Sequence, residues 1–542
     1  MRAPIIHTDE YAYLDIARYL AHGGRLPRAQ YYPGYSLLLV PVAWVTRDPL
    51  TLYRGALVVN ALLAGSTTVL SYLLAGRWAP AVPRRAWIAA AIVVAAYPAF
   101  LLAGNLALSE NLFIPAFLGL VLMVHDTGPG DRPRRWAALG VAGGALLVVH
   151  PRALAVDAAL VLVVAFVLQP WRRRGAIAAT LAFGSGLAAA AVIARLLTNH
   201  VTRHANVAVY RTGDVAARNL HLSSIGKALG EGAGQTLYIV AATVGLAALG
   251  FVIALRSGIR LATRANAPAV HRAAAFSGLA VVAVLVMASL FLSNGERLDH
   301  WIYGRYVEGV VAPLIVLSVL AAGRLPARTL VTTLAGGGAL LLLCGALVTV
   351  VHHGATRGPI VRTNTMGVDA LFRATGFRLD VALLTAIAVG GLGIAIAYGR
   401  WGRPVAAVIV ALLFLPSIVT SEQFLVDGSR SRSGERVVAE TIVGLRRHDG
   451  ASERCIAYDD ATYSIFHFWN YRYFVPDVEM TRFDSRTGGH PCSDLVISGR
   501  PDLFVALPGA RLVTWEHDAP QGLWVLPGPL QDRLAAAKRL PS

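Results

Sequence analysis

Charged side chains are scarce in this sequence. Only 15% of its 542 residues are Asp, Glu, Lys or Arg, against about 25% in a typical soluble protein. Three cysteines are too few for a disulfide-dense secreted scaffold, and a 56% share of hydrophobic residues is too high for a disordered chain. These shortages exclude an ordinary cytosolic enzyme and leave an integral membrane protein.

Lysine is almost missing, since Lys227 and Lys538 are the only two, and arginine supplies nearly all of the net charge of +18. A nucleic-acid binder would need a clustered basic face. Here the arginines lie in short connectors between apolar segments, and such loops belong on the cytoplasmic side of a membrane. The charge therefore indicates orientation, and no nucleic-acid partner is expected.

Several catalytic signatures are also absent. The sequence has no Walker-type phosphate loop, dinucleotide glycine motif, metal-ligand Cys or His spacing, or Gly-x-Ser-x-Gly elbow. The connectors assigned to the cytoplasm are too short to form a nucleotide site. An enzyme with this layout would take its activated substrate from a lipid.

Long apolar runs are what the sequence does have, each about the length that crosses a hydrocarbon core. They predict an α-helical polytopic membrane protein with about 12 spans in a transmembrane domain over 55–420. The expected spans are 55–76, 86–104, 107–124, 136–150, 153–169, 175–197, 236–255, 273–292, 306–322, 329–351, 381–398 and 404–420.

The arginine distribution places the long, acid-containing loops outside. A first outer loop with an acidic motif and interfacial helices is expected over 1–54. The N-terminus then lies outside with no preceding span and no signal-peptide pattern. Either a first helix is missing from the reading frame, which we favour, or the segment from Gly34 to Thr46 enters the membrane.

The tail changes composition and predicts a small extracytoplasmic α/β domain over 421–542. Its expected elements are a helix at 434–447 and strands at Cys455–Tyr458, Leu495–Ser498, Leu512–Trp515 and Leu523–Leu526, separated by Gly, Pro and Asp. An oxidising compartment would permit a disulfide between Cys455 and Cys492, and the sequence leaves this pairing open. Cys344 lies in a span, where packing explains it.

The first candidate site is the pair Asp9 and Glu10, at the head of an expected helix that ends near His22. Acidic residues in a first turn also suit simple helix capping. An aromatic cluster that includes Tyr32 follows, and aromatics favour the membrane interface. The aromatic cluster therefore favours a functional acidic pair at the membrane surface over simple helix capping.

Three further candidates lie at the expected outer ends of spans. Glu110 opens a span, and an ionisable residue at membrane depth marks a functional site by default, although it could also sit in water at a helix start. Arg152 could snorkel to the headgroups or bind a phosphate through its bidentate fork. Arg305, followed by Tyr306, is placed to meet a lipid phosphate, with an ion pair to Glu308 as the structural alternative.

The order of these features resembles the GT-C superfamily of polyprenyl-phosphate-sugar-dependent glycosyltransferases. The branch that it resembles most contains the protein O-mannosyltransferases and lipid A aminoarabinose transferases in bacterial multi-pass forms. The resemblance covers roughly residues 7–320. It is carried by Asp9-Glu10-Tyr11 with Tyr13, Ala17 and Gly23, Tyr32-Pro33-Gly34-Tyr35, Leu108-Ser109-Glu110, Pro151-Arg152, and Arg305-Tyr306 with Pro313.

The resemblance implies roles for individual residues. Asp9 matches the catalytic base on the acceptor hydroxyl, and Glu10 matches a neighbour that orients substrate. Glu110 matches an acidic residue near the second outer loop, and Arg152 and Arg305 match positions that hold the donor phosphate. Tyr32 and Tyr306, within the matching motifs, are expected at the substrate.

No cofactor is expected, and a divalent metal is left open because the Asp-x-Asp pair of some relatives is absent. The family's usual first span is missing as well. These departures leave metal dependence and the true start of the chain undecided.

The resemblance implies an inverting glycosyltransferase, either hexosyl or pentosyl, on the outer face of the plasma membrane. Its expected partners are a polyprenyl-phosphate sugar donor, the lipid bilayer, and a hydroxyl acceptor on a lipid, cell-envelope glycan or protein. Mannose, arabinofuranose, glucose and galactose stay open as the sugar. The alternative is a transporter or flippase of polyprenyl-linked lipids. A third reading, a membrane scaffold that presents the tail as a binding domain, leaves Glu110 and Arg305 unexplained.

Overall fold

The computed structural model describes most of the chain. The described residues are 5, 8–24, 26, 31–169, 176–203, 222–263, 267–293, 297–321, 325–352, 361–398, 403–448, 455–461, 465–517 and 520–540. Several arginines of the short connectors that the sequence assigns to the cytoplasmic side lie outside these ranges, among them Arg172, Arg264 and Arg324. The chain divides into two compact units. One comprises Met1–Pro27, Leu39–Leu57 and Gln423–Ser542, and the other comprises Arg28–Leu38 and Val58–Glu422.

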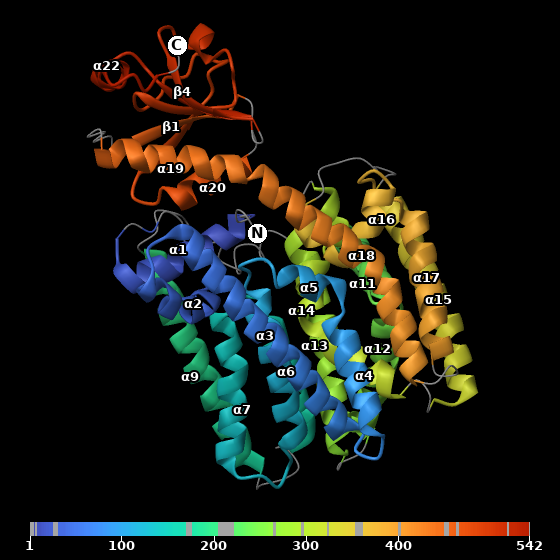
Figure 1. Ribbon diagram of the computed structural model, residues 1–542. Helices are drawn as coiled ribbons and strands as arrows, with labels where there is room; N and C mark the ends of the chain where they lie inside the picture. Colours follow the sequence, from blue (N-terminus) through green and yellow to red (C-terminus); the bar gives the residue numbers. More distant parts are fainter. Residues whose placement is uncertain are drawn as a thin grey trace. The chain divides into compact units, whose positions relative to one another are not determined.

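The second unit is built from apolar helices that run alongside one another (Figure 1). Helix α2 (Gly34–Val45) and helix α3 (Pro49–Trp78) are shared with the first unit, which contains their residues between Leu39 and Leu57, and the last helix of the series continues into the first unit from Gln423 on. The helices that follow are α4 (Arg84–Ala95), α5 (Pro98–Ala103), α6 (Glu110–Asp126), α7 (Pro133–Ala145), α8 (Ala153–Leu168), α9 (Ala176–Arg203), α11 (Leu222–Ala242), α12 (Leu246–Thr263), α13 (Ala269–Leu292), α14 (Gly304–Ala321), α15 (Ala327–Val351), α16 (Asp369–Ala374), α17 (Val381–Tyr398) and α18 (Arg403–Ser431). Short 3-10 turns interrupt the connectors: η1 (Leu146–Val148), η2 (Leu298–Ile302), η4 (Arg362–Asn364) and η5 (Met366–Val368).

Six helices in the described part of the chain are long and apolar enough to cross a membrane, or seven if one bent pair counts as a span. The prediction of a multi-pass helical membrane protein is confirmed, but the number of twelve spans is not. The expected span 86–104 shows one reason, since it is broken between α4 and α5 at Tyr97. Pro98 starts α5, and a proline cannot donate the backbone hydrogen bond that would continue α4.

The first unit contains a five-stranded sheet with the strand order β2-β1-β3-β5-β4. Its strands are β1 (Cys455–Asp459), β2 (Glu479–Phe483), β3 (Leu495–Ser498), β4 (Arg511–Glu516) and β5 (Gln521–Val525). Strand β1 pairs in parallel with β2 and β3, with Ile456 opposite Met480, while β5 is antiparallel to β3 and β4. The predicted α/β domain is confirmed, with β2 as a strand that the sequence did not predict.

Helices complete this unit. The helices α19 (Ser433–His448), α20 (Ile465–Phe474), α21 (Leu503–Ala506) and α22 (Pro529–Ala536) accompany the sheet. Helix α19 packs against β4, β5 and α20 (Figure 1). Buried Ala457, Val496, Leu503 and Trp524 form the core on the sheet, which explains why the short apolar strands of the tail fold together.

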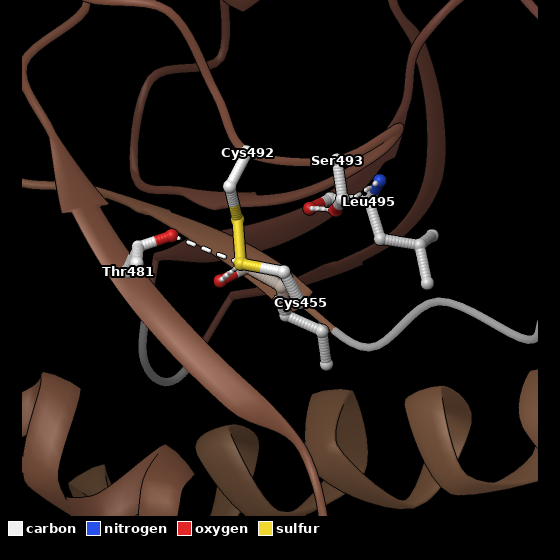
Figure 2. The surroundings of a disulfide bond; sticks show 6 residues. Cys455, Thr481, Cys492, Ser493 and Leu495 are labelled. Atoms are coloured by element: carbon white, nitrogen blue, oxygen red, sulfur yellow. Dashed lines mark hydrogen bonds between the residues drawn. A yellow bond between two sulfur atoms is a disulfide. The ribbon is translucent and has the colours of Figure 1, made fainter.

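Cys455 and Cys492 form a disulfide that closes a sequence separation of 37 residues (Figure 2). It joins the start of β1 to the segment just before β3, and the Thr481 hydroxyl of β2 lies 3.0 Å from the Cys455 sulfur. The pairing that the sequence left open is therefore made. It holds the parallel strands of the sheet together at one end.

The disulfide gives a first prediction. Under denaturing, non-reducing conditions, alkylation should label one of the three cysteines, Cys344, and after reduction it should label all three. Replacing both Cys455 and Cys492 by Ser should destabilise this domain by roughly 3–4 kcal/mol, because a loop of this length is no longer closed in the unfolded chain. Intact-mass spectrometry and thermal unfolding check both results; three labels without reduction would contradict the bond.

Helix α1 (Thr8–His22) carries a buried carboxyl group, Asp15. Burial raises its pKa from 3.8 to about 6, although Arg18, Tyr11 and Arg472 favour its charged form. Since the folded pKa exceeds the unfolded one, ionisation opposes folding as the pH rises from about 4 to 6, and the full cost is present above that window.

The opposition between Asp15 ionisation and folding gives the second prediction. It concerns Asp15→Asn, in which the new side chain does not ionise. Relative to wild type, the free energy of unfolding of the variant should rise between pH 4 and pH 7 by up to about 3 kcal/mol. Chemical denaturation of both proteins across this range measures it. A difference that does not vary with pH would show that Asp15 ionises normally in the folded protein.

Candidate functional site

The acidic pair lies in the first turn of α1, as the sequence predicts. Glu10 is fully buried and Asp9 is half-buried. The helix ends at His22 because Gly23 and Gly24 follow with positive φ angles of 69° and 96°, a conformation that glycine adopts without strain. The predicted helix is confirmed. His7, which precedes it, lies outside the described residues.

Aromatic side chains of α20 hold α1 in place. The Tyr11 ring lies 5.3 Å from the Trp469 ring and 6.5 Å from the Tyr473 ring, centroid to centroid. Arg18 stacks on Tyr473 at 4.2 Å and donates a hydrogen bond to its backbone oxygen. At the other end of α1, His22 Nε2 lies 2.8 Å from the Ala43 backbone oxygen. The acidic pair is therefore carried on a helix fixed at both ends.

Sequence reasoning missed this role of α20. The signal was present, because residues 465–474 read IFHFWNYRYF, an unusual density of rings in a polar tail. Nothing in that run names α1 as its partner, since the two helices are separated by more than 400 residues of sequence.

The second unit brings three of the predicted residues together. Arg305, in the first turn of α14, donates from Nε to Glu110 Oε1 at 2.8 Å and from Nη2 to Oε2 at 3.3 Å. Arg152 Nη2 lies 3.5 Å from the same Glu110 Oε1. Side-chain exposures of 0–6% show that all three charges are removed from solvent. Two guanidinium groups thus meet one carboxylate, which forms a buried ionic cluster.

Arg152 is fixed by several groups. Its Nη1 donates to the backbone oxygens of Arg305 and Tyr306 at 3.0 and 3.3 Å, and its guanidinium lies 4.3 Å from the Phe113 ring centroid. Arg152 is fully buried, so the alternative that it snorkels to the headgroups is wrong. The alternative that Glu110 sits in water is wrong for the same reason, since Glu110 is 4% exposed.

Glu308 is not the partner of Arg305, which corrects the structural alternative drawn from their spacing. Its Oε1 accepts hydrogen bonds from the hydroxyls of Tyr97, at 3.2 Å, and Tyr238. The Gly367 backbone N–H in turn donates to the Tyr238 oxygen at 2.8 Å. Glu308 therefore ties α14 to α11 and η5, one turn beyond the ionic cluster.

Gly304 makes this arrangement possible. A Cβ atom at this position would lie 1.8 Å from Cε1 of Tyr238, so only glycine fits at the start of α14. Tyr97, Tyr238 and Gly367 were not predicted from the sequence as neighbours of the site. The only sequence signal for the two tyrosines is that each lies within an apolar run, where a buried hydroxyl group needs a hydrogen-bond partner.

The two predicted tyrosines lie in the same unit. Tyr306 is half-buried and its ring lies 4.7 Å from the Tyr303 ring and 5.5 Å from the His150 ring. Tyr32 is also half-buried, two residues before α2 begins at Gly34. Tyr306 therefore borders the ionic cluster, whereas Asp9 and Glu10 belong to the other unit.

The ionic cluster gives a third prediction. Glu110→Gln leaves two guanidinium groups buried without their carboxylate, and removing one partner of a buried ion pair costs about 3–5 kcal/mol. We expect a large drop in the thermal unfolding midpoint of the protein in detergent. Asp126→Asn, at the other end of α6, is the matched control, because its pair with Arg77 is about half exposed and should contribute less than about 1 kcal/mol. Equal effects of the two variants would contradict a buried cluster.

No protein-family model and no curated protein sequence matches the chain. Two solved structures of ArnT from Cupriavidus metallidurans, an aminoarabinose transferase, are similar over almost the whole length. The structure bound to undecaprenyl phosphate has 16% identity and a TM-score of 0.51, and covers 98% of this chain and 95% of that one. The apo structure has 16% identity and a TM-score of 0.50, with 97% and 95% covered.

An oligosaccharyltransferase from Archaeoglobus fulgidus is 12% identical, with 92% of this chain and 66% of that chain covered. Its TM-score is 0.45. The similarity to ArnT extends over the helical unit and the tail, and it confirms the fold that the sequence motifs implied. The chain is a multi-pass membrane protein with the GT-C glycosyltransferase fold.

Proposed function

We propose that this protein is an inverting glycosyltransferase that moves a sugar from a polyprenyl phosphate to a hydroxyl acceptor. The observation that carries the proposal is the buried cluster of Arg305, Arg152 and Glu110, in a chain with the GT-C fold. The structure of ArnT with undecaprenyl phosphate supports a donor of the same class. The acceptor hydroxyl belongs to a lipid, a cell-envelope glycan or a protein.

Arg305 and Arg152 suit a leaving phosphate. A guanidinium group matches phosphate oxygens with its planar fork, and fixed donors in a water-poor site stabilise charge that grows in the transition state. Glu110 accepts hydrogen bonds from Nε and Nη2 of Arg305 and so fixes the plane of the Arg305 guanidinium group. We assign Glu110 a positioning role and the two arginines the contact with the donor phosphate, beside Tyr306.

Asp9 is proposed as the general base. Its carboxylate takes the proton of the acceptor hydroxyl while that oxygen attacks the anomeric carbon. The bond from the anomeric carbon to the phosphate oxygen breaks, and the electron pair leaves with the polyprenyl phosphate. A single direct displacement inverts the anomeric centre. Glu10 and Tyr32 are assigned to substrate orientation, and no step needs a metal ion. Among the described residues, no three His, Cys, Asp or Glu are grouped as metal ligands.

The proposed location is the plasma membrane, with the acidic pair and the sheet domain on the extracytoplasmic face. The arginine-rich connectors support this orientation, and the Cys455–Cys492 disulfide supports an oxidising compartment for the tail. A lipid-linked donor fits this face because it is held in the bilayer, so the reaction needs no soluble nucleotide sugar there.

The fourth prediction tests the base. Purified protein is incubated with a panel of polyprenyl-phosphate sugars and a membrane glycan extract, and donor consumption is followed. Asp9→Asn should slow consumption of the active donor by about 10²–10⁴-fold, the usual contribution of a general base. Asp532→Asn, an acid in α22 of the same unit, is the control that should keep full activity.

Each outcome separates the parts of the proposal. Consumption of one donor by wild type and Asp532→Asn but not by a folded Asp9→Asn protein supports enzyme and base together and names the sugar. Equal consumption by all three keeps the enzyme and removes Asp9 as its base. No consumption of any donor favours the transporter.

A further inference from the structure

The unit that carries the sheet contains a cavity of about 900 Å³ that the proposed chemistry does not use. Three segments of this unit form it: the residues from Arg47 to Leu50, one face of α19, and the residues from Phe474 to Asp477 after α20. A cavity of this size is in the range that holds a small-molecule ligand or a lipid headgroup.

Arginines dominate the polar lining. Arg47, Arg436, Arg446 and Arg447 face three acids, Asp48, Glu440 and Asp477. Two of those acids already have local partners. Glu440 pairs with Arg436 one helical turn away at 2.6 Å, and Asp48 accepts hydrogen bonds from the Thr51 backbone N–H and hydroxyl at 2.7 and 2.6 Å.

The charges of the other three arginines, Arg47, Arg446 and Arg447, are not neutralised by a nearby carboxylate in the described part of the chain and could bind an anionic ligand. Within the described residues, no carboxylate lies within ion-pair distance of Arg47, Arg446 or Arg447. Arg446 gives an independent sign, because its Nε atom is buried and has no hydrogen-bond partner among the described residues. A buried donor without a partner is costly, and an anion with several oxygens in the cavity would satisfy it.

The surroundings of the cavity indicate a lipid. Pro49 and Leu50, in its wall, are the first residues of α3, which is long and apolar enough to cross a membrane. Just before them in the chain, Trp44 and Val45 are 64% and 88% exposed. Tryptophan is favoured at the membrane–water interface, and an exposed apolar tip next to basic residues is typical of a segment that lies on a charged membrane.

We propose that this cavity binds the phosphate-bearing headgroup of an anionic phospholipid. Arg446 and Arg447 on α19, together with Arg47, would bind the phosphate oxygens through charge-assisted hydrogen bonds. Trp44 and Val45 would meet the adjoining acyl region. The site anchors the sheet domain at the membrane surface and does not depend on the proposed transfer reaction.

The fifth prediction concerns lipid retention. The full chain, purified in detergent, is titrated with phosphatidylglycerol or phosphatidylcholine, and bound lipid is measured by native mass spectrometry. Wild type should retain phosphatidylglycerol in preference to phosphatidylcholine. The double variant Arg446→Gln, Arg447→Gln should bind phosphatidylglycerol roughly tenfold more weakly, as expected when charge-assisted hydrogen bonds are lost.

Arg511→Gln is the matched control, because Arg511 is an exposed arginine of β4 in the same unit but does not line the cavity. It should bind like wild type. Arg47→Gln, outside the helices, provides a second cavity variant in case the α19 double variant fails to fold. Thermal unfolding shows that each variant is folded.

A second arm separates the two sources of phosphate. Soluble glycerol 3-phosphate is tested as a competitor of phosphatidylglycerol and as a ligand by itself. Weaker lipid retention in the cavity variants but not in Arg511→Gln supports the proposal. Equal retention in all folded variants overturns it. Arginine-dependent binding of glycerol 3-phosphate without retention of the lipid overturns the lipid source and assigns the cavity to a soluble phosphate.

Discussion

The interaction on which the helical unit depends is the buried cluster of Glu110, Arg305 and Arg152. Charges removed from water are stable only when they are paired and hydrogen-bonded. Here one carboxylate joins the start of α6 to the start of α14, and Arg152, just before α8, joins both. Displacing any one of these helices would leave a charge unpaired in an apolar interior. The cluster therefore sets how the N-terminal ends of α6, α8 and α14 meet.

A second polar network supports the first. Glu308 lies one turn after Arg305 on α14 and accepts hydrogen bonds from Tyr97 and Tyr238. Because Gly304 lets the Tyr238 ring pack against the backbone, α11 lies directly on the start of α14. The two networks use different carboxylates: Glu110 accepts hydrogen bonds from Arg305, and Glu308 accepts them from the tyrosines. Glu110 is therefore left to orient Arg305. Fixed donors of this kind are what a site for a leaving phosphate requires.

Much of the local structure could be read from the sequence. The first-turn acids and the Gly23-Gly24 stop predicted α1, and short apolar runs predicted four of the five strands. Strand β2 was missed because Glu479–Phe483 is mostly polar and is held by pairing with β1, which local pattern does not show. The break at Tyr97 was missed because hydropathy averages over a window and ignores a single proline. Which residues perform chemistry stays a prediction, since the motifs name candidates but not contacts.

The sequence by itself determined the apolar layout, the shortage of charge and the side of the membrane that each connector favours, because these follow from composition and spacing. Tertiary structure decided the partners. Glu110 and Arg305 are 195 residues apart. Glu308, only three residues from Arg305, instead accepts hydrogen bonds from Tyr238 of α11 and from Tyr97 between α4 and α5. Charges in an apolar interior pair with whatever opposite charge packing brings within reach, and packing is a property of the whole fold.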